Sequence, residues 1–136
     1  METVLTLVLP AELQQLPVFI GAVTEAAEAS GVAQKTLFEI ELALEEALVN
    51  IMNHAYEGTK GDIRVVCMAE SGRAFVVEIT DSGKDFDMTS LPAPDVTAGI
   101  DERTIGGLGI YFIKKLADRV SYRREDGKNI LAITFV

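Results

Sequence analysis

The chain has 136 residues, which favours a single domain over residues 1–136 because two domains would each lie near the lower limit of independent folding. Hydrophobic residues make up 49% and charged residues 24%, a globular balance that excludes extended disorder. Acidic residues outnumber basic ones 21 to 12, and the net charge of −9 predicts no nucleic acid and no anionic membrane among the partners. The single cysteine, Cys67, excludes an internal disulfide and fits a reducing compartment, so we expect a cytoplasmic protein.

The first half of the chain predicts one strand followed by two helices. Residues 3–9 are rich in β-formers and end at Pro10, as a strand does. Apolar residues then recur every three or four positions over 12–29, which predicts a helix that stops at Ser30-Gly31. A second stretch with the same period, over 34–57, predicts a longer helix closed by Gly58.

The second half changes to a period of two. Alternation predicts two hairpins, whose strands cover 62–70 with 73–80 and 120–124 with 129–136. Between the hairpins, residues 108–118 have helical periodicity. The preceding stretch from 81 to 107 holds two prolines and little periodicity, and loops of this length are often functional lids. We therefore place a lid at approximately residues 85–105.

The order of elements predicts the fold class. Strands joined by tight turns imply a mostly antiparallel mixed sheet, and the three helices would pack on one face of it. The expected fold is therefore an α/β (α+β) two-layer sandwich. The chain contains neither the Gly-rich dinucleotide fingerprint after a strand nor a phosphate-binding P-loop, so a Rossmann domain is excluded.

Glu46 and Asn50 form the first candidate site. They are four residues apart in the predicted helix, so their side chains project to the same place. The simplest interpretation of these polar residues is a helix face that is exposed to solvent. Asparagine is a poor helix former, however, and both Asn50 and Asn53 lie deep in the helix. A carboxylate beside an amide oxygen can hold Mg²⁺ together with phosphate oxygens and leave one carboxylate to act on a proton.

Asp81 and Gly83 form the second candidate site, at the end of an apolar strand. An ordinary turn would also place these residue types there. As a binding site, the carboxylate would accept a hydrogen bond from an exocyclic amine, and Gly83 would let a flat ring approach.

The glycines at the start of the helix over 108–118 form the third candidate site. Glycine costs ~1 kcal/mol relative to alanine within a helix, so three glycines among four residues need a reason. A flexible hinge is one explanation. A phosphate site is the other, because backbone N–H groups point outward at a helix N-terminus.

Together, the strings LEEALVNIMNHAY, DSGKDFD and GGLGIYFIKKLAD resemble the Bergerat-fold (GHKL) ATP-binding family. This family includes histidine kinases, type II topoisomerases, Hsp90 and MutL. The chain is most similar to its smallest branch, the bacterial anti-sigma-factor serine kinases, and the resemblance covers nearly the whole length.

The resemblance implies a role for each matching residue. Asn50 would coordinate the Mg²⁺ that bridges the ATP phosphates, and Glu46 would be the general base that deprotonates a serine hydroxyl. Asp81 would accept the adenine amino group, and Gly83 would flank the ring. Further residues would contact ATP: Asn53 and His54 near the phosphates, and Gly106, Gly107, Leu108 and Gly109 around them. His54 also fits a structural role.

The function implied by the resemblance is an ATP-dependent serine/threonine protein kinase of the anti-sigma-factor type. It would phosphorylate a small STAS-like anti-anti-sigma partner, sequester a sigma factor, or do both, and it could form a homodimer. Related kinases often have an arginine before the glycine pair, where this chain has Ile105. That departure favours a second hypothesis, a nucleotide-gated binding module that regulates a partner through ordering of the lid without phosphotransfer. A sandwich that binds no nucleotide is the third, and it leaves the asparagines and glycines unexplained.

Overall fold

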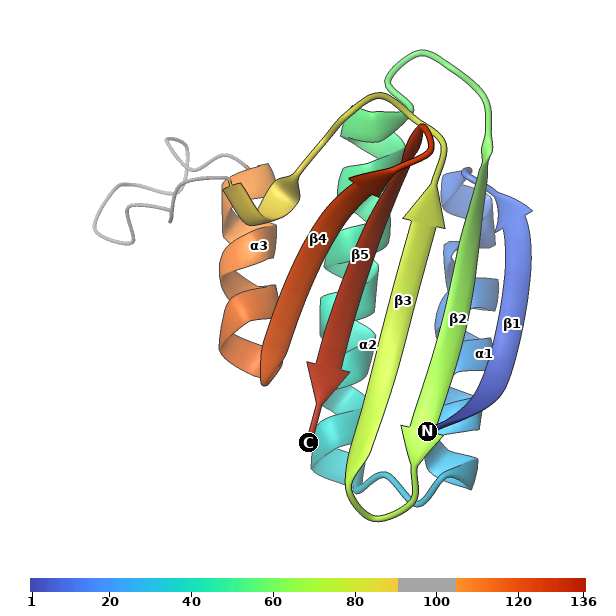
Figure 1. Ribbon diagram of the computed structural model, residues 1–136, viewed down its shortest axis with the longest axis vertical. Coiled ribbons are helices and arrows are strands. Elements are labelled where there is room, and N and C mark those ends of the chain that lie inside the picture. The colour runs from blue at the N-terminus through green and yellow to red at the C-terminus, as the bar shows by residue number, and fades with distance from the viewer. Residues whose placement is uncertain (91–104) are drawn as a thin grey trace.

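The computed structural model describes residues 1–90 and 105–136, and for 105–109 it describes the backbone alone. Within these described residues, three α-helices and five strands follow one another in the order β1-α1-α2-β2-β3-α3-β4-β5 (Figure 1). The helices are α1 (Leu16–Ala29), α2 (Gln34–Asn50) and α3 (Ile105–Leu116). The strands are β1 (Glu2–Pro10), β2 (Asp62–Glu70), β3 (Ala74–Asp81), β4 (Arg119–Glu125) and β5 (Lys128–Phe135). The elements therefore occur in the predicted order.

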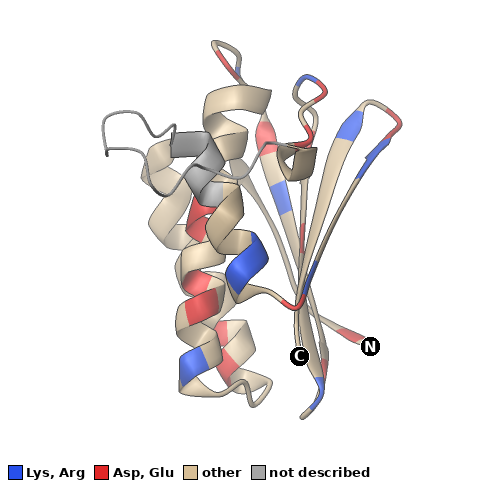
Figure 2. Cartoon of the chain, turned by 90° about the vertical axis from the view of Figure 1, so that its left-hand side faces the viewer, with Lys and Arg blue, Asp and Glu red and all other residues tan. Residues whose placement is uncertain are grey.

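The strands form one sheet in the order β1-β2-β3-β5-β4. All four pairings among the described strands are antiparallel. The helices cover one face of this sheet, and the view along its edge separates the two layers (Figure 2). The two-layer α+β sandwich predicted from the sequence is confirmed.

Alternation along the strands places one set of side chains in the core. On β3, Phe75, Val77 and Ile79 are buried against the helices, while Glu78 and Thr80 on the other face are half-buried. The helices contribute large apolar side chains to the same core, among them Phe19, Ile40, Leu44 and Leu48. Inward-facing positions are apolar in this pattern because burial of apolar area is the main favourable term in folding. A polar residue at such a position therefore needs a separate explanation.

The second helix does not stay α-helical to residue 57. It is α-helical as far as Asn50 and then widens into a π-helical turn, Ile51–Ala55, in which the Tyr56 N–H donates to the Ile51 carbonyl at 3.1 Å. π-turns are rare and often accompany functional sites. Asn50, at the end of the α-helical part, is buried, whereas the side chain of Asn53 in the π-helical turn is exposed, so the two asparagines do not share one environment.

The third helix begins at Ile105, three residues before the predicted start, so the glycines of the third candidate site belong to its first turns. Most of the predicted lid, from 91 to 104, lies outside the described residues. The part that precedes it contains a short 3₁₀ turn, Met88–Ser90. Among the described residues, no helix has the length and apolar character required to cross a bilayer.

Candidate functional site

The C-terminal end of β3 and the end of the second helix meet in direct contact. Gly83 packs against the helix so closely that an added Cβ atom would lie 2.4 Å from the Ala55 carbonyl oxygen. The N–H of Lys84 donates to the same oxygen at 2.9 Å. Ala55 follows Asn50 by five residues, about one turn further along the helix. The fold therefore brings the first two candidate sites, 31 residues apart in sequence, to the same end of the molecule.

Asp81 occupies an inward-facing position at the end of β3 and is only 2% exposed. Its Oδ1 atom accepts two hydrogen bonds at 2.9 Å, one from the Gly83 N–H and one from Asn129 Nδ2. Burial raises the pKa of this carboxyl, and the two hydrogen bonds together with the charge of Arg124 act in the opposite direction. Among the described residues none donates to Oδ2, so this oxygen can accept a bond from a ligand.

Asn50 is also 2% exposed. Its Nδ2 atom donates to the Glu46 carbonyl one turn earlier at 2.7 Å, which fixes the orientation of the amide. Within the described part of the chain, no hydrogen bond reaches Oδ1. A buried oxygen without a donor is costly, and it is the kind of ligand that Mg²⁺ accepts. The interpretation of Asn50 as part of a solvated helix face is wrong.

Glu46 lies on the same side of α2 as Asn50 and is half-buried. Burial, and secondarily the charge of Glu45, raise the pKa of Glu46. A carboxylate with a raised pKa is a stronger base, so the environment suits proton transfer. The described residues contain no group of three His, Cys, Asp or Glu side chains able to hold a metal ion, so a metal bound here would also need oxygens from its ligand.

His54 and Asn53 are exposed beyond the buried part of the helix. The His54 ring stacks on the ring of Phe86, with 5.0 Å between the ring centroids. The structure therefore connects His54 to the segment that follows β3, through a contact with Phe86 that no pattern in the sequence indicates.

Residues 83–86 follow β3 and are called the post-β3 segment. This segment contacts the end of the helix on one side and the β4–β5 hairpin on the other. On the helix side are the Lys84 hydrogen bond to Ala55, the His54–Phe86 stack, and an exposed ion pair of Lys84 with Glu57 at 3.1 Å. On the hairpin side, Arg124 Nη1 donates to the Gly83 carbonyl at 2.9 Å. The segment that carries Gly83 is thus held in place by contacts within the chain itself.

Tyr56 provides a further connection that the sequence did not reveal. Its hydroxyl donates to the Asp62 carbonyl at 2.6 Å and accepts from the Ser82 N–H at 2.7 Å. The end of the helix is thereby joined to the start of β2 and to the end of β3. Asn129 on β5 was also missed, although an asparagine at an inward-facing strand position was a signal available in the sequence.

The third candidate site lies at the N-terminal end of α3, which packs along α2 (Figure 1). The backbone at Gly106, Gly107, Leu108 and Gly109 is helical. A helix N-terminus carries a partial positive charge and favours anions. The side chains of 105–109 lie outside the described part of the structure, so the geometry of the predicted phosphate contacts stays a prediction.

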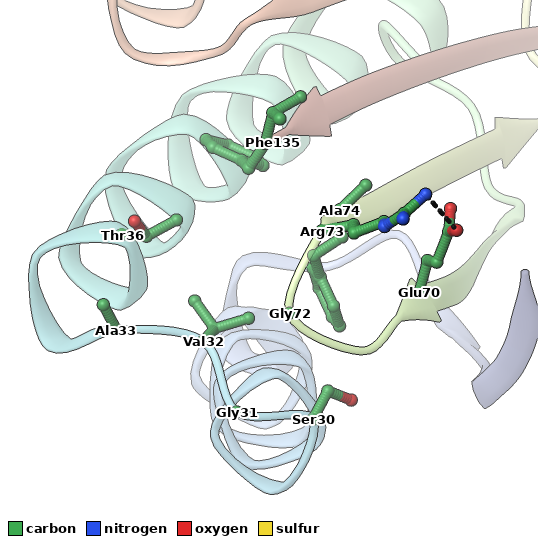
Figure 3. A pocket seen from close by; sticks show the side chains of 12 residues that line it. Ser30, Gly31, Val32, Ala33, Thr36, Glu70, Gly72, Arg73, Ala74 and Phe135 are labelled. Atoms are coloured by element: carbon green, nitrogen blue, oxygen red, sulfur yellow. Dashed lines mark ion pairs between the residues drawn. The ribbon is translucent and has the colours of Figure 1, made fainter.

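A cavity with a volume of about 230 Å³ lies at the other end of the sheet, and Figure 3 shows the residues that line it. It is formed by the connection between α1 and α2, the turn between β2 and β3, and the end of β5. An ion pair of Arg73 with Glu70, at 3.7 Å, lies at its wall. The residues that line this cavity include no member of the three candidate sites.

Comparisons with known proteins bear on the family and on the fold. Residues 9–135 match the family described as the histidine kinase-like ATPase domain. Among curated proteins, the serine-protein kinases RsbW of Bacillus cereus (strain AH187) and Bacillus anthracis (strain CDC 684 / NRRL 3495) are each 24% identical over 132 residues, covering 94% of this chain and 82% of the relative.

Two solved structures share the fold. A chain of the SiaB-SiaC complex from Pseudomonas aeruginosa has a TM-score of 0.63 at 16% identity, with 98% of this chain and 90% of that chain covered. The blue-light activated histidine kinase EL346 of Erythrobacter litoralis has a TM-score of 0.56 at 18% identity, with 88% of this chain and 41% of that chain covered.

Proposed function

Since this chain belongs to the family of histidine kinase-like ATPase domains, we propose that it is an ATP-dependent serine/threonine protein kinase of the anti-sigma-factor type. Its similarity to the serine-protein kinases RsbW over 94% of its length supports this function. The proposed acceptor is a serine or threonine of a small STAS-like anti-anti-sigma protein, and the proposal includes a cytoplasmic location and the ability to hold a sigma factor. A homodimer stays a prediction.

One observation carries the proposal: two buried oxygens, Asp81 Oδ2 and Asn50 Oδ1, accept no hydrogen bond from the described residues. They lie on elements that touch through Gly83 and Ala55. The adenine amino group of ATP would donate to Asp81, and Asn50 would be a protein ligand of the magnesium ion. Mg²⁺ supplies neutralisation of the phosphate charge when it is bound with ATP.

Glu46 is the proposed general base. The acceptor hydroxyl forms a new O–P bond with the γ-phosphorus, the bond between that phosphorus and the β,γ-bridging oxygen breaks, and ADP leaves with the electron pair. The hydroxyl proton passes to the Glu46 carboxylate. Burial favours this transfer because it raises the pKa of Glu46.

The Asn50→Ala variant is expected to bind Mg-ATP about tenfold more weakly, because one oxygen ligand of the magnesium ion is lost. We take the free energy of this interaction to be similar to that of a hydrogen bond to a charged group. Affinity for ATP in excess EDTA should change much less. Isothermal titration of both proteins with and without Mg²⁺ measures the difference. An equal loss under both conditions would remove Asn50 as the metal ligand.

The Asp81→Asn variant separates stability from binding. The new side-chain amide keeps the acceptor oxygen for Gly83 and Asn129 but replaces Oδ2 with an NH₂ group that opposes the adenine amine, so ATP affinity should fall about 100-fold. Because the folded pKa of Asp81 is raised, the folded protein holds more protons than the unfolded chain between the two pKa values. The wild type therefore loses stability as pH rises through this window.

At neutral pH the Asp81→Asn variant should accordingly have a higher melting temperature than the wild type without nucleotide. Calorimetry at several pH values and an ATP titration test both parts. A variant that binds ATP as the wild type does would contradict the adenine-reading role, whatever its stability.

A second function, the nucleotide-gated binding module without phosphotransfer, is favoured by Ile105 at a position where related kinases often have arginine. Incubation with Mg-ATP and a co-purified STAS-like partner distinguishes the two. Labelled partner selects the kinase. Unlabelled partner, together with hydrogen-exchange protection of residues 85–105 by ATP, selects the module.

A further inference from the structure

Asn129 is a buried polar residue to which the proposed reaction assigns no role. It lies on β5 directly opposite Asp81 in the antiparallel pairing of β3 with β5, and the residue is 3% exposed. The next inward-facing positions on this strand are Leu131, Ile133 and Phe135, all apolar. Burial of an amide costs free energy unless its donors and acceptors are paired. An asparagine at this position therefore needs neighbours that pair with both its amide nitrogen and its amide oxygen.

Every hydrogen-bonding group of the Asn129 side chain has a partner. The Nδ2 atom donates to Asp81 Oδ1 at 2.9 Å and to the Lys84 carbonyl at 2.8 Å. The Oδ1 atom faces three donors: the Phe86 N–H at 3.2 Å, the Tyr122 hydroxyl at 2.6 Å and Arg124 Nη1 at 3.1 Å.

These partners fix the orientation of the amide. Acceptors lie on the Nδ2 side and donors on the Oδ1 side, so a flipped amide would oppose both sets. Burial and the nearby Asp85 carboxylate raise the pKa of Tyr122 to about 12, so its hydroxyl remains a donor at neutral pH. Asn129 therefore joins Asp81, the post-β3 segment and the β4–β5 hairpin in one arrangement.

We propose that Asn129 is a positioning residue for nucleotide binding, which holds Asp81 Oδ1 and thereby leaves Oδ2 as the atom that receives the ligand's amino group. This inference rests on the proposed function, because it assigns a partner to the adenine-reading carboxylate. It also gives the post-β3 segment its position relative to Asp81, since the same Nδ2 atom binds both.

The consequence is a change in the protonation of Asp81 when Asn129 is removed. With two donors on Oδ1, a proton taken up by Asp81 goes to Oδ2, where it would turn the acceptor into a donor that opposes an amine. Burial raises the pKa of Asp81, and the hydrogen bond from Asn129 is the largest of the interactions that lower this pKa. Loss of that bond therefore raises the pKa further.

Few other ionisable groups act on Asp81 in the described structure. The Arg124 guanidinium, from β4, lowers the pKa of Asp81 through its charge, and the neutral phenol of Tyr56 approaches from the end of the helix. The Cα partner on β2 is the apolar Ile63. Asn129 is therefore the main polar side chain in contact with this carboxylate.

The test compares Asn129→Ala with Tyr122→Phe. Tyr122→Phe is the matched control, because it removes one donor to Asn129 Oδ1 and leaves the Nδ2 bond to Asp81 in place. The Asp81 carboxyl is titrated by ¹³C NMR in the nucleotide-free proteins, and ATP affinity is measured from pH 5 to pH 8. Asn129→Val, which has no side-chain donor, is used in the same way if Asn129→Ala is not folded by circular dichroism.

We expect a higher pKa for Asp81 in Asn129→Ala than in the wild type, and an ATP affinity about tenfold lower that decreases further as pH falls. Tyr122→Phe should leave the Asp81 titration unchanged. An Asp81 titration identical in the wild type and a folded Asn129 variant overturns the role of Asn129. A wild-type protein that binds no ATP overturns the proposed function instead, so the two failures are distinguishable.

Discussion

Replacement of Glu46 by glutamine is expected to lower the rate of phosphoryl transfer about 10²- to 10⁴-fold, which is the usual contribution of a positioned general base. ATP affinity should stay within about twofold of the wild type, because the glutamine keeps the size of the side chain and the Asn50 amide bonds the backbone carbonyl of residue 46. Single-turnover transfer to the co-purified partner, at saturating Mg-ATP, measures the effect.

The matched control is Glu45→Gln, because Glu45 is the exposed neighbour of Glu46 on the same helix. This control removes the same charge at the next position and should retain transfer. Since the pKa of Glu46 is raised, the wild-type rate should increase as pH rises through that pKa, whereas residual transfer in Glu46→Gln should lack this step. Equal rates for Glu46→Gln and the wild type would exclude Glu46 as the base.

The fold could be predicted from the sequence because its signals are local. Alternation in β2 and β3 and the three- to four-residue period of α1 record which face each element buries. The boundaries were less accurate where the backbone departs from regular geometry. The π-helical turn at Ile51–Ala55 has no signature in a 3.6-residue period, and Asn53 within this turn is exposed.

The candidate site was predictable only in part. Asp81 and Asn50 stand out as polar residues within apolar stretches. The partners that define their environment come from distant parts of the chain, such as Asn129, which is 48 residues from Asp81. Pairing of that kind depends on strand register, because β5 adds to the sheet beside β3 rather than beside β2. No spacing rule within one segment indicates it.

Gly83 shows the same dependence on tertiary contacts, and it gives the prediction with the largest expected structural effect. The sequence suggested that this glycine lets a ring approach, whereas the structure shows a close contact with the helix. A Cβ at position 83 would lie 2.4 Å from the Ala55 carbonyl oxygen, 2.6 Å from its carbon and 2.9 Å from the Ala55 Cβ. These are mostly backbone atoms, which cannot turn away as a flexible side chain can.

The Gly83→Ala variant is therefore expected to lose about 1–3 kcal/mol of stability, the usual cost of overpacking. Its affinity for ATP should fall as well, because the displaced segment carries the Lys84 hydrogen bond to Ala55 and the N–H that bonds Asp81. Gly21→Ala in α1 is the matched control. A Cβ there meets nothing within 4 Å, so the same substitution should stabilise the protein by ~0.5–1 kcal/mol and leave ATP affinity unchanged.

Urea unfolding and ATP titration of both variants test the opposite signs. Amide exchange at Lys84 gives a local readout, since the bond to Ala55 should open in Gly83→Ala before the sheet does. If Gly83→Ala matched the wild type in stability and in nucleotide affinity, the contact between the helix end and the strand end would not set the geometry of the site. A loss of ATP affinity with little loss of global stability would instead show that the contact acts on the position of Asp81 more than on the core.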